Sequence, residues 1–262
     1  MLITTRLFPT RAIGGSRAHK VLERDVLVYR RNWIVIFSGF FEPVFYLLGI
    51  GFGLGTLVGD VGDIPYAAFV APGLMATAAM NGALFESTFN LFFKLKYART
   101  FDAMLATPLS PSDVAVGEVS WALIRGLAYA VAFILVMALL GLVLSPWGVL
   151  AIPGAVLIGF ASAALGTAAT TFMRKWQDFD IVTVVTMPLF LFSGTFFPIS
   201  VYPDALRILI EITPLYRGVH MLRSFSLGEL DALVLVDVAY LAMLGLMGVA
   251  ITSRRLRTLL LK

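Results

Sequence analysis

Six apolar segments, each long enough to cross a bilayer, constrain the fold of this 262-residue chain more than any other feature. A membrane-spanning helix needs about 20 mostly apolar residues. The segments that meet this length are residues 33–58, 64–93, 114–144, 149–173, 179–197 and 232–253. Inside lipid, a helix satisfies its own backbone hydrogen bonds. The sequence therefore predicts an all-α membrane protein with six transmembrane helices.

The composition leaves little material for a domain outside the membrane. Hydrophobic residues make up 59% of the chain and charged residues 14%, whereas a soluble domain is roughly 45–50% apolar. We therefore predict a single membrane domain over residues 33–253. It is flanked by a cytoplasmic N-terminal segment over residues 1–32 and a basic cytoplasmic tail over residues 254–262.

The distribution of Lys and Arg predicts the orientation of the spans. These residues are concentrated in the N-terminal segment, in the loops after the second and fourth predicted spans, and in the C-terminal tail. Cytoplasmic loops of membrane proteins carry an excess of Lys and Arg. Six spans place all of these regions on one side. We therefore expect a multi-pass protein of the inner or plasma membrane with both termini in the cytoplasm.

Two further segments predict helices that do not cross the membrane. Residues 14–32 alternate apolar and basic side chains, which is typical of an amphipathic helix lying in the interface; a solvated charged tail is the alternative. Residues 198–230 combine prolines with apolar runs too short to span. Such runs suit short helices that enter the membrane where protein buries their backbone. We predict a re-entrant helical hairpin on the outer side.

The sequence lacks the usual signs of an enzyme or of a nucleic-acid-binding protein. It has no G-x-x-x-x-G-K-[ST] phosphate loop. Its two histidines, His19 and His220, fall on opposite predicted sides of the membrane and so do not share a metal site. The basic residues flank the spans and form no nucleic-acid-binding stripe. We therefore predict no enzymatic activity, no catalytic residue, and no metal or cofactor in this chain.

Ionisable side chains within the predicted spans are candidate functional residues, because a charge in a span costs roughly 2.5–3.5 kcal/mol. They are Glu42, Glu86, Glu118, Arg125 and Asp237. Glu86, Glu118 and Arg125 are expected to share the inner half of the membrane. Glu118 and Arg125 are about 10.5 Å apart along a helix, so Arg125 is expected to contact Glu86 instead. This cluster either locks the fold or takes part in gating or cargo contact.

The loop over residues 94–113 combines a basic start, a short amphipathic run over residues 99–105, and two prolines, Pro108 and Pro111. A short cytoplasmic helix ended by prolines can form a rigid contact for another protein. A tight connector between two spans is an equally good interpretation of the spacing alone.

Four stretches of the sequence carry a family resemblance. They are Glu42-Pro43 with Tyr46-Leu47 and GFGLG at 51–55; FVAPG at 69–73; RTFDAMLATPLS at 99–110 with Gly117-Glu118; and FSGTFFP at 192–198 with Pro203, Pro214-Leu215-Tyr216 and Arg223. Together, and in this order, they resemble the permease subunits of type-2 ABC exporters. Within that family they resemble the NodJ-like branch associated with lipo-oligosaccharide and drug export.

The resemblance implies a type-2 ABC transmembrane domain over residues 33–253 and two kinds of protein partner. One is a second permease copy, in a homodimer or a related heterodimer. The other is a separate ATP-binding subunit, present in two copies, which holds ATP and Mg. The assembled exporter would move an amphiphilic or hydrophobic cargo, such as a glycolipid, a lipo-oligosaccharide or a drug, outward across the inner membrane.

The resemblance also implies roles for individual residues. The ATPase-coupling loop would comprise Arg99, Thr100, Phe101, Asp102, Leu105, Thr107 and Pro108. The outer gate would comprise Phe197, Pro198, Pro203, Pro214, Tyr216 and Arg223. Closure of the ATP-binding subunits would then shift the inner loops and open a lateral path between the permeases.

Two other functional classes compete with this interpretation. An internal inverted repeat or polar half-helices at mid-membrane would favour a secondary carrier or channel without an ATPase partner. An intramembrane enzyme would need a buried nucleophile or a metal-ligand set. The sequence shows neither pattern.

Overall fold

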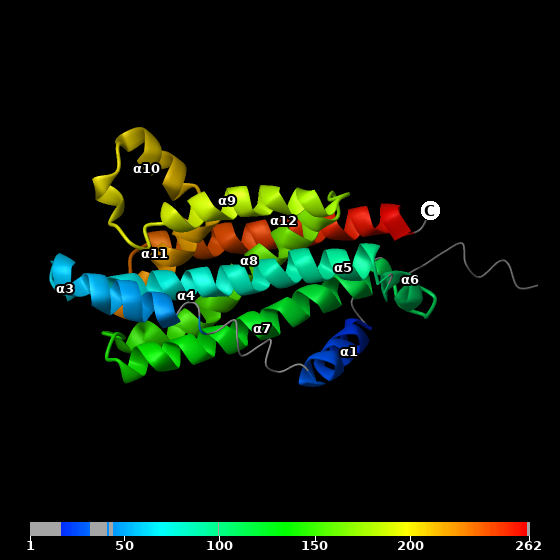
Figure 1. Ribbon diagram of the computed structural model, residues 1–262, viewed down its shortest axis with the longest axis horizontal. Coiled ribbons are helices and arrows are strands. Elements are labelled where there is room, and N and C mark those ends of the chain that lie inside the picture. Colours follow the sequence, from blue (N-terminus) through cyan, green and yellow to red (C-terminus); the bar gives the residue numbers. More distant parts are fainter. Residues whose placement is uncertain (1–16, 32–40, 42–43, 99, 261–262) are drawn as a thin grey trace, which may run out of the picture.

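The structure is a computed structural model that describes residues 17–31, 41, 44–98 and 100–260, without the side chains of seven of them. Those side chains belong to Arg31, Asp102, Leu105, Leu256, Arg257, Leu259 and Leu260. Long helices lie side by side along one axis (Figure 1). We refer to the two ends of this bundle as the α6 end and the α10 end, after the short helices that lie there.

Among the described residues, four helical segments are long and apolar enough to cross a membrane. They are Tyr66–Lys96, Pro111–Leu139, Pro146–Thr170 and Leu233–Arg255. Their helical elements are α4 (Tyr66–Phe85), η3 (Glu86–Asn90), α5 (Leu91–Lys96), α7 (Pro111–Leu139), η4 (Pro146–Leu150), α8 (Ala151–Thr170) and α12 (Leu233–Leu260). An all-α membrane protein is therefore confirmed, and these helices correspond to the second, third, fourth and sixth predicted spans.

The first and fifth predicted spans correspond to shorter described helices. Residues 33–40 and 42–43 lie outside the described residues, and the remainder forms the apolar helix Val44–Val58, with η2 (Leu47–Leu54) and α3 (Gly55–Val58). Helix α9 (Phe179–Leu191) has 13 residues and ends before the predicted limit at residue 197. It ends early because Gly194 adopts a left-handed backbone with φ of 73° and the chain turns back into the bundle.

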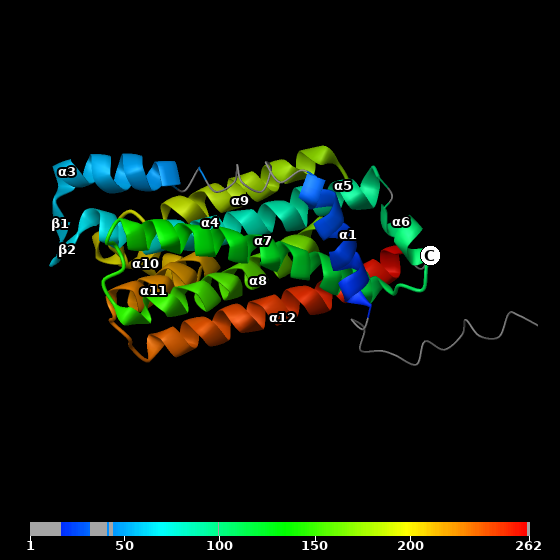
Figure 2. The same ribbon diagram turned by 90° about the horizontal axis from the view of Figure 1, so that it is seen from below.

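The remaining elements are short. They are β1 (Asp60–Val61), β2 (Ile64–Pro65), α1 (Ala18–Arg31), α6 (Thr100–Leu105), η5 (Trp176–Asp178), η6 (Ile199–Val201), α10 (Asp204–Glu211) and α11 (Pro214–Leu227). Strands β1 and β2 pair antiparallel, with Asp60 opposite Pro65 and Val61 opposite Ile64. Figure 2 shows this hairpin at the α10 end, while α1 lies across the bundle toward the α6 end.

Helix α8 is the centre of the bundle because its residues are small. It packs against α4, α7, α11 and α12. Its buried face is mostly alanine and glycine, and small residues let the backbones of membrane helices approach closely. The main core cluster joins larger side chains around it, including Phe69, Phe133 and Met221. Helix α9 contacts η5 and α11, and its first residue, Phe179, packs against Phe89 of η3 and Phe92 of α5.

The start of α7 shows how local sequence places the elements at the α6 end. Ser110 caps the helix, since its hydroxyl accepts from the Asp113 backbone N–H at 3.1 Å and its own N–H donates to Asp113 Oδ2 at 2.9 Å. Pro111 occupies the first helical position, where a proline is favoured. Asp113 Oδ1 also accepts the backbone N–H of Arg17 at 3.0 Å. This one cap therefore fixes the start of α1 to the start of α7.

The contact between α8 and α12 depends on Gly248, where an added Cβ would lie 2.6 Å from the Ala164 carbonyl carbon. We expect Gly248→Ala to force the two helices apart and to cost about 1–3 kcal/mol, as overpacking does. Thermal unfolding in detergent would measure the loss. The matched control is Gly126→Ala, where a Cβ meets nothing within 4 Å. Equal stability of the two variants would contradict this account of the packing.

Candidate functional site

A buried network of charges at the α6 end connects three parts of the chain. It is built by α1, by the α4–η3–α5 segment and by α7. Segment η3 is a π-helical turn inside an otherwise α-helical span, and such turns are frequent at functional sites. Glu86 opens this turn, and its side chain is almost fully buried. The network therefore surrounds a local irregularity of the second predicted span.

The predicted contact between Arg125 and Glu86 is present. Arg125 Nη1 donates to Glu86 Oε2, and both side chains are buried. Arg125 Nε also donates to the hydroxyl of Tyr129 at 3.0 Å. The Tyr29 hydroxyl donates to Glu86 Oε1 at 3.0 Å and accepts from Asn90 Nδ2 at 2.8 Å. Helix α1 is thereby bonded directly to the ion pair between η3 and α7.

Glu118 and Lys94 form a second ion pair, which reaches α1 through Asp25. Lys94 Nζ lies 2.7 Å from Glu118 Oε2 and 3.2 Å from Asp25 Oδ1. Asp25 also contacts Arg24 Nη1 at 2.8 Å. Burial raises the pKa of the Asp25 carboxyl, and the charge of Lys94 opposes that shift. Lys94 therefore links α1 to α7 in the way that Arg125 links η3 to α7.

The network binds α1 more firmly than its sequence pattern predicts. Val21 and Asp25 are buried against the bundle, whereas Leu27 is exposed. The ring centroids of Tyr29 and Trp121 are 4.9 Å apart. Among the described residues, Asp25 Oδ2 and Glu118 Oε1 have no hydrogen-bond partner. Asp25, Tyr29 and Lys94 were not among the predicted site residues. The sequence does hold a signal for Asp25, because this acidic residue lies one turn after Val21 on the apolar side of α1.

The predicted coupling loop forms helix α6 at the same end. Phe101 and Met104 point inward and share a buried cluster with Val21, Leu91 and Val114. This cluster joins α6 to α1, to α5 and to the start of α7. Phe101 thus anchors the helix from within.

The other predicted coupling residues lie at the start of α6 and in the segment that follows it. Thr107 and Pro108 are exposed after the helix, and the backbone carbonyl of Pro108 accepts from Arg17 Nη1 at 2.5 Å. Thr100 begins α6 and is partly buried. Arg99 lies outside the described residues, as do the side chains of Asp102 and Leu105.

The predicted outer-gate residues lie at the α10 end, where Arg223 joins two of the motifs. Its Nε donates to the Phe69 carbonyl at 3.1 Å, and its Nη2 donates to the Gly194 carbonyl at 2.8 Å. Its guanidinium carbon lies 3.8 Å from the centroid of the Phe69 ring. A Cβ on Gly73 would lie 2.9 Å from Thr195 Cα, so only a glycine allows this approach. Arg223 therefore fastens the 193–197 turn to α4.

The remaining gate residues frame α10 and α11. Phe197 is exposed on the turn, and Pro198 and Pro203 precede η6 and α10. Pro214 is the first residue of α11, and the Tyr216 ring lies near the Cβ position of Gly194. Helix α11 is packed against α4, α8 and α12.

Asp237 forms a second buried ion cluster, remote from Glu86. Its Oδ1 lies 3.1 Å from Arg217 Nη1, and its Oδ2 lies 2.6 Å from His220 Nδ1. His220 Nε2 lies 3.9 Å from Asp231 Oδ2. The hydrogen bond to Asp237 raises the pKa of His220, while burial opposes the shift. Glu42, the last predicted intramembrane acid, lies outside the described residues.

The two clusters hold helices together through buried ion pairs. Within the described ranges, no group of three or more His, Cys, Asp or Glu side chains could hold a metal ion. Arg125 contacts Glu86 as expected, Glu118 is paired with Lys94 of α5, and Asp237 lies in the separate cluster.

Comparison with known proteins adds a family match. A family model described as ABC-2 type transporter matches residues 19–226. The chain is 33% identical over 244 residues to Nodulation protein J of Sinorhizobium fredii, covering 88% of this chain and 93% of that protein. It is 32% identical over 251 residues to Nodulation protein J of Rhizobium leguminosarum bv. viciae, covering 93% and 96%. It is 25% identical over 240 residues to the inner membrane transport permease YadH of Escherichia coli, covering 88% of each.

The Glu86–Arg125 pair can be tested by a double-mutant cycle. Removing one partner of a buried ion pair leaves a buried charge and costs about 3–5 kcal/mol. We expect Glu86→Gln and Arg125→Met each to cost this much, and the double variant to cost about 1–3 kcal/mol less than the sum. Unfolding of the purified protein in detergent gives all four values. Strictly additive losses would rule out a direct interaction.

The His220–Asp237 pair makes stability depend on pH. A histidine with a raised folded-state pKa stabilises the fold fully below its unfolded value of about 6.5, and this contribution is lost as pH rises through the raised pKa. We expect Tm to be lower at about pH 9 than at about pH 6, and His220→Gln to reduce that difference. His19→Gln, at an exposed position of α1, should behave like the unmodified protein. An unchanged pH dependence in His220→Gln would contradict the assignment.

Proposed function

Because the chain belongs to the ABC-2 type transporter family, we propose that it is the permease of an exporter driven by a separate ATP-hydrolysing subunit. The cargo is amphiphilic or hydrophobic: a glycolipid, a lipo-oligosaccharide or a drug. It moves outward across the inner membrane. The observation that carries this proposal is the family match over residues 19–226, which includes α1 apart from its first residue, α6 and the turn fastened by Arg223.

The proposed orientation places the α6 end in the cytoplasm, together with both termini. The support is the charge at that end, where Lys94, Lys96, Arg174, Lys175 and Arg254 lie in or beside the ends of α5, α8 and α12. Basic residues accumulate on the cytoplasmic side of membrane proteins. The choice of membrane is supported by the similarity to YadH, an inner membrane transport permease.

The proposed membrane domain has six spans and a re-entrant hairpin. Residues 33–58 supply the first span and α9 with the following turn supplies the fifth. Helices α10 and α11 have 8 and 14 residues, fewer than the about 20 that a span requires. Because α11 is packed among α4, α8 and α12, its backbone is shielded from lipid, as a re-entrant helix requires.

In the proposed complex, this chain pairs with a second permease, which is either another copy of itself or a related chain. Two ATP-binding subunits, which hold ATP and Mg, would dock on the α6 helices of the two permeases. Phe101 and Met104 fasten α6 to α1, α5 and α7, so a push on α6 moves these helices together. Lys94 and Arg125 carry that movement into the spans through their buried ion pairs. The outer turn around Arg223 would then open.

Co-expression with ATP-binding proteins encoded nearby tests the proposal. We expect a complex that is stable in detergent and has vanadate-sensitive ATPase activity. A pure, folded permease that recruits none of these proteins would overturn the ATP-driven mechanism.

A substitution on α6 locates the docking surface. Ala103 is exposed on α6, so Ala103→Arg should prevent recovery of the ATP-binding subunit without changing the Tm of the permease. Loss of the order of ten-fold or more in recovered subunit is expected, because an unpaired charge within an interface costs several kcal/mol. Ala205→Arg, at an exposed position of α10, is the matched control at the opposite end. Full recovery with Ala103→Arg would exclude this face of α6.

A further inference from the structure

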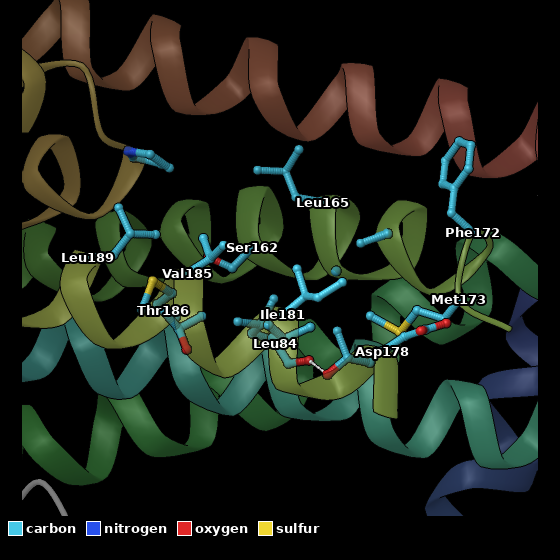
Figure 3. Close-up of a pocket in the computed structure, with 16 residues that line it drawn as sticks. Leu84, Ser162, Leu165, Phe172, Met173, Asp178, Ile181, Val185, Thr186 and Leu189 are labelled. Atoms are coloured by element: carbon cyan, nitrogen blue, oxygen red, sulfur yellow. Dashed lines mark hydrogen bonds between the residues drawn. The ribbon is translucent and has the colours of Figure 1, made fainter. Parts of the chain in front are cut away.

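An apolar groove runs between α9 and the pair of helices α4 and α8. Its volume is 560 Å³, within the roughly 300–1,000 Å³ of ligand sites. Figure 3 shows Leu165 and Phe172 of the α8 side and Ile181 and Val185 of α9 among the side chains that line it. The few polar side chains of its wall include the hydroxyls of Ser162 and Thr186. This lining suits a hydrocarbon ligand.

The length of the groove matches one leaflet of a bilayer. It extends from Asp178, just before α9, to Leu189, eleven residue steps or about 16 Å of helix. The hydrocarbon core of a bilayer is about 30 Å thick, so one leaflet is about half of that. An extended acyl chain therefore fits along the groove.

The groove is accessible from the side, because most of α9 beyond its first residue is exposed. Phe179 is the only buried residue of α9, all of whose residues are described. Ile181 and Val185 line the groove and are still more than half exposed. A chain can therefore enter laterally from the lipid without unfolding the bundle.

The mouth of the groove at the α6 end is basic. Arg174 and Lys175 are exposed there, and Arg255 stacks on the groove residue Phe172 with its guanidinium carbon 4.3 Å from the ring centroid. The Nε of Arg255 is buried and has no hydrogen-bond partner among the residues that the structure covers. Asp178 turns its carboxylate to the backbone N–H groups of Arg174 and Lys175, at 2.6 and 3.0 Å. The Asp178 carboxylate is therefore hydrogen-bonded to the backbone of Arg174 and Lys175, whose exposed side chains can reach an anionic group.

The opposite end of the groove reaches Pro214, the first residue of α11. Tyr216 follows it and packs near Gly194 of the turn fastened by Arg223. A site for an ordinary membrane lipid needs no such continuity. The groove instead connects the basic mouth to the elements of the proposed outer gate.

We propose that this groove binds the acyl chain of an amphiphilic cargo whose anionic headgroup lies among Arg174, Lys175 and Arg255. The inference rests on the proposed export function and names the ligand chemistry of the permease: one acyl chain with a negatively charged polar group at the α6 end.

Photo-crosslinking of the purified full chain in nanodiscs tests it. The probe is a sixteen-carbon alkyl phosphate with a diazirine in its chain, which represents the simplest anionic single-chain amphiphile. We expect labelled peptides from α8 near Leu165 and from α9 near Val185. The Val185→Trp substitution fills part of the groove and should expel about two methylenes of the acyl chain. Losing the burial of two methylenes weakens binding about ten-fold, so labelling should fall by about that factor. Val184→Trp, one residue away, exposed and outside the lining, is the matched control.

A second variant and a second probe make the outcome decisive. Ala169→Trp fills the groove from the α8 wall and should reproduce the loss if Val185→Trp disturbs α9. Labelling that Val184→Trp reduces as much as both groove variants overturns the proposal. Equal labelling by a two-chain phosphatidylglycerol with the same diazirine shows a membrane-lipid site and also overturns it. Because no ATP-binding subunit is present, failure here is distinct from failure to recruit an ATPase.

Discussion

The buried ion pair between Glu86 and Arg125 determines how the α6 end is assembled. A charge inside a membrane protein is costly unless it is paired, so neither residue tolerates the absence of the other. Tyr29 adds α1 to this pair, and Lys94 adds a second link between α1 and α7. Three segments far apart in the chain are thus held in one arrangement. A movement that separates them must separate opposite charges, which favours their moving as a unit.

Small residues and close packing explain the rest of the bundle. Because α8 is largely alanine and glycine, it takes the centre, and glycines such as Gly248 bring α12 against it. Helix α9 has bulky residues on all sides and, apart from Phe179, none is buried in the chain. The same constraint that tightens α4, α7, α8 and α12 therefore leaves α9 outside, with the apolar groove beneath it.

Much of this could be predicted from the sequence, for identifiable reasons. Segment length and hydropathy were sufficient to predict four spans. The cost of a buried charge was sufficient to predict the contact between Glu86 and Arg125. The end of α9 was placed too late because hydropathy continues through Phe196 and Phe197, while Gly194 decides where the helix stops. Asp25 and Tyr29 were missed because α1 was interpreted as facing lipid, whereas its inner face is bonded to protein. The family resemblance read from four motifs is confirmed by the comparisons.

The π-helical turn η3 has a geometrical consequence for the span that contains it. Each residue of an α-helix turns the chain by about 100°, and a π-turn accommodates one residue more than the α-helix would. The rotational phase of α5 relative to α4 therefore depends on that extra residue. This rotation lets Lys94 of α5 point toward α1 and α7, while α4 stays packed on the same side as before. In this span, the direction in which a side chain points therefore depends on the number of residues in the turn as well as on the residue type.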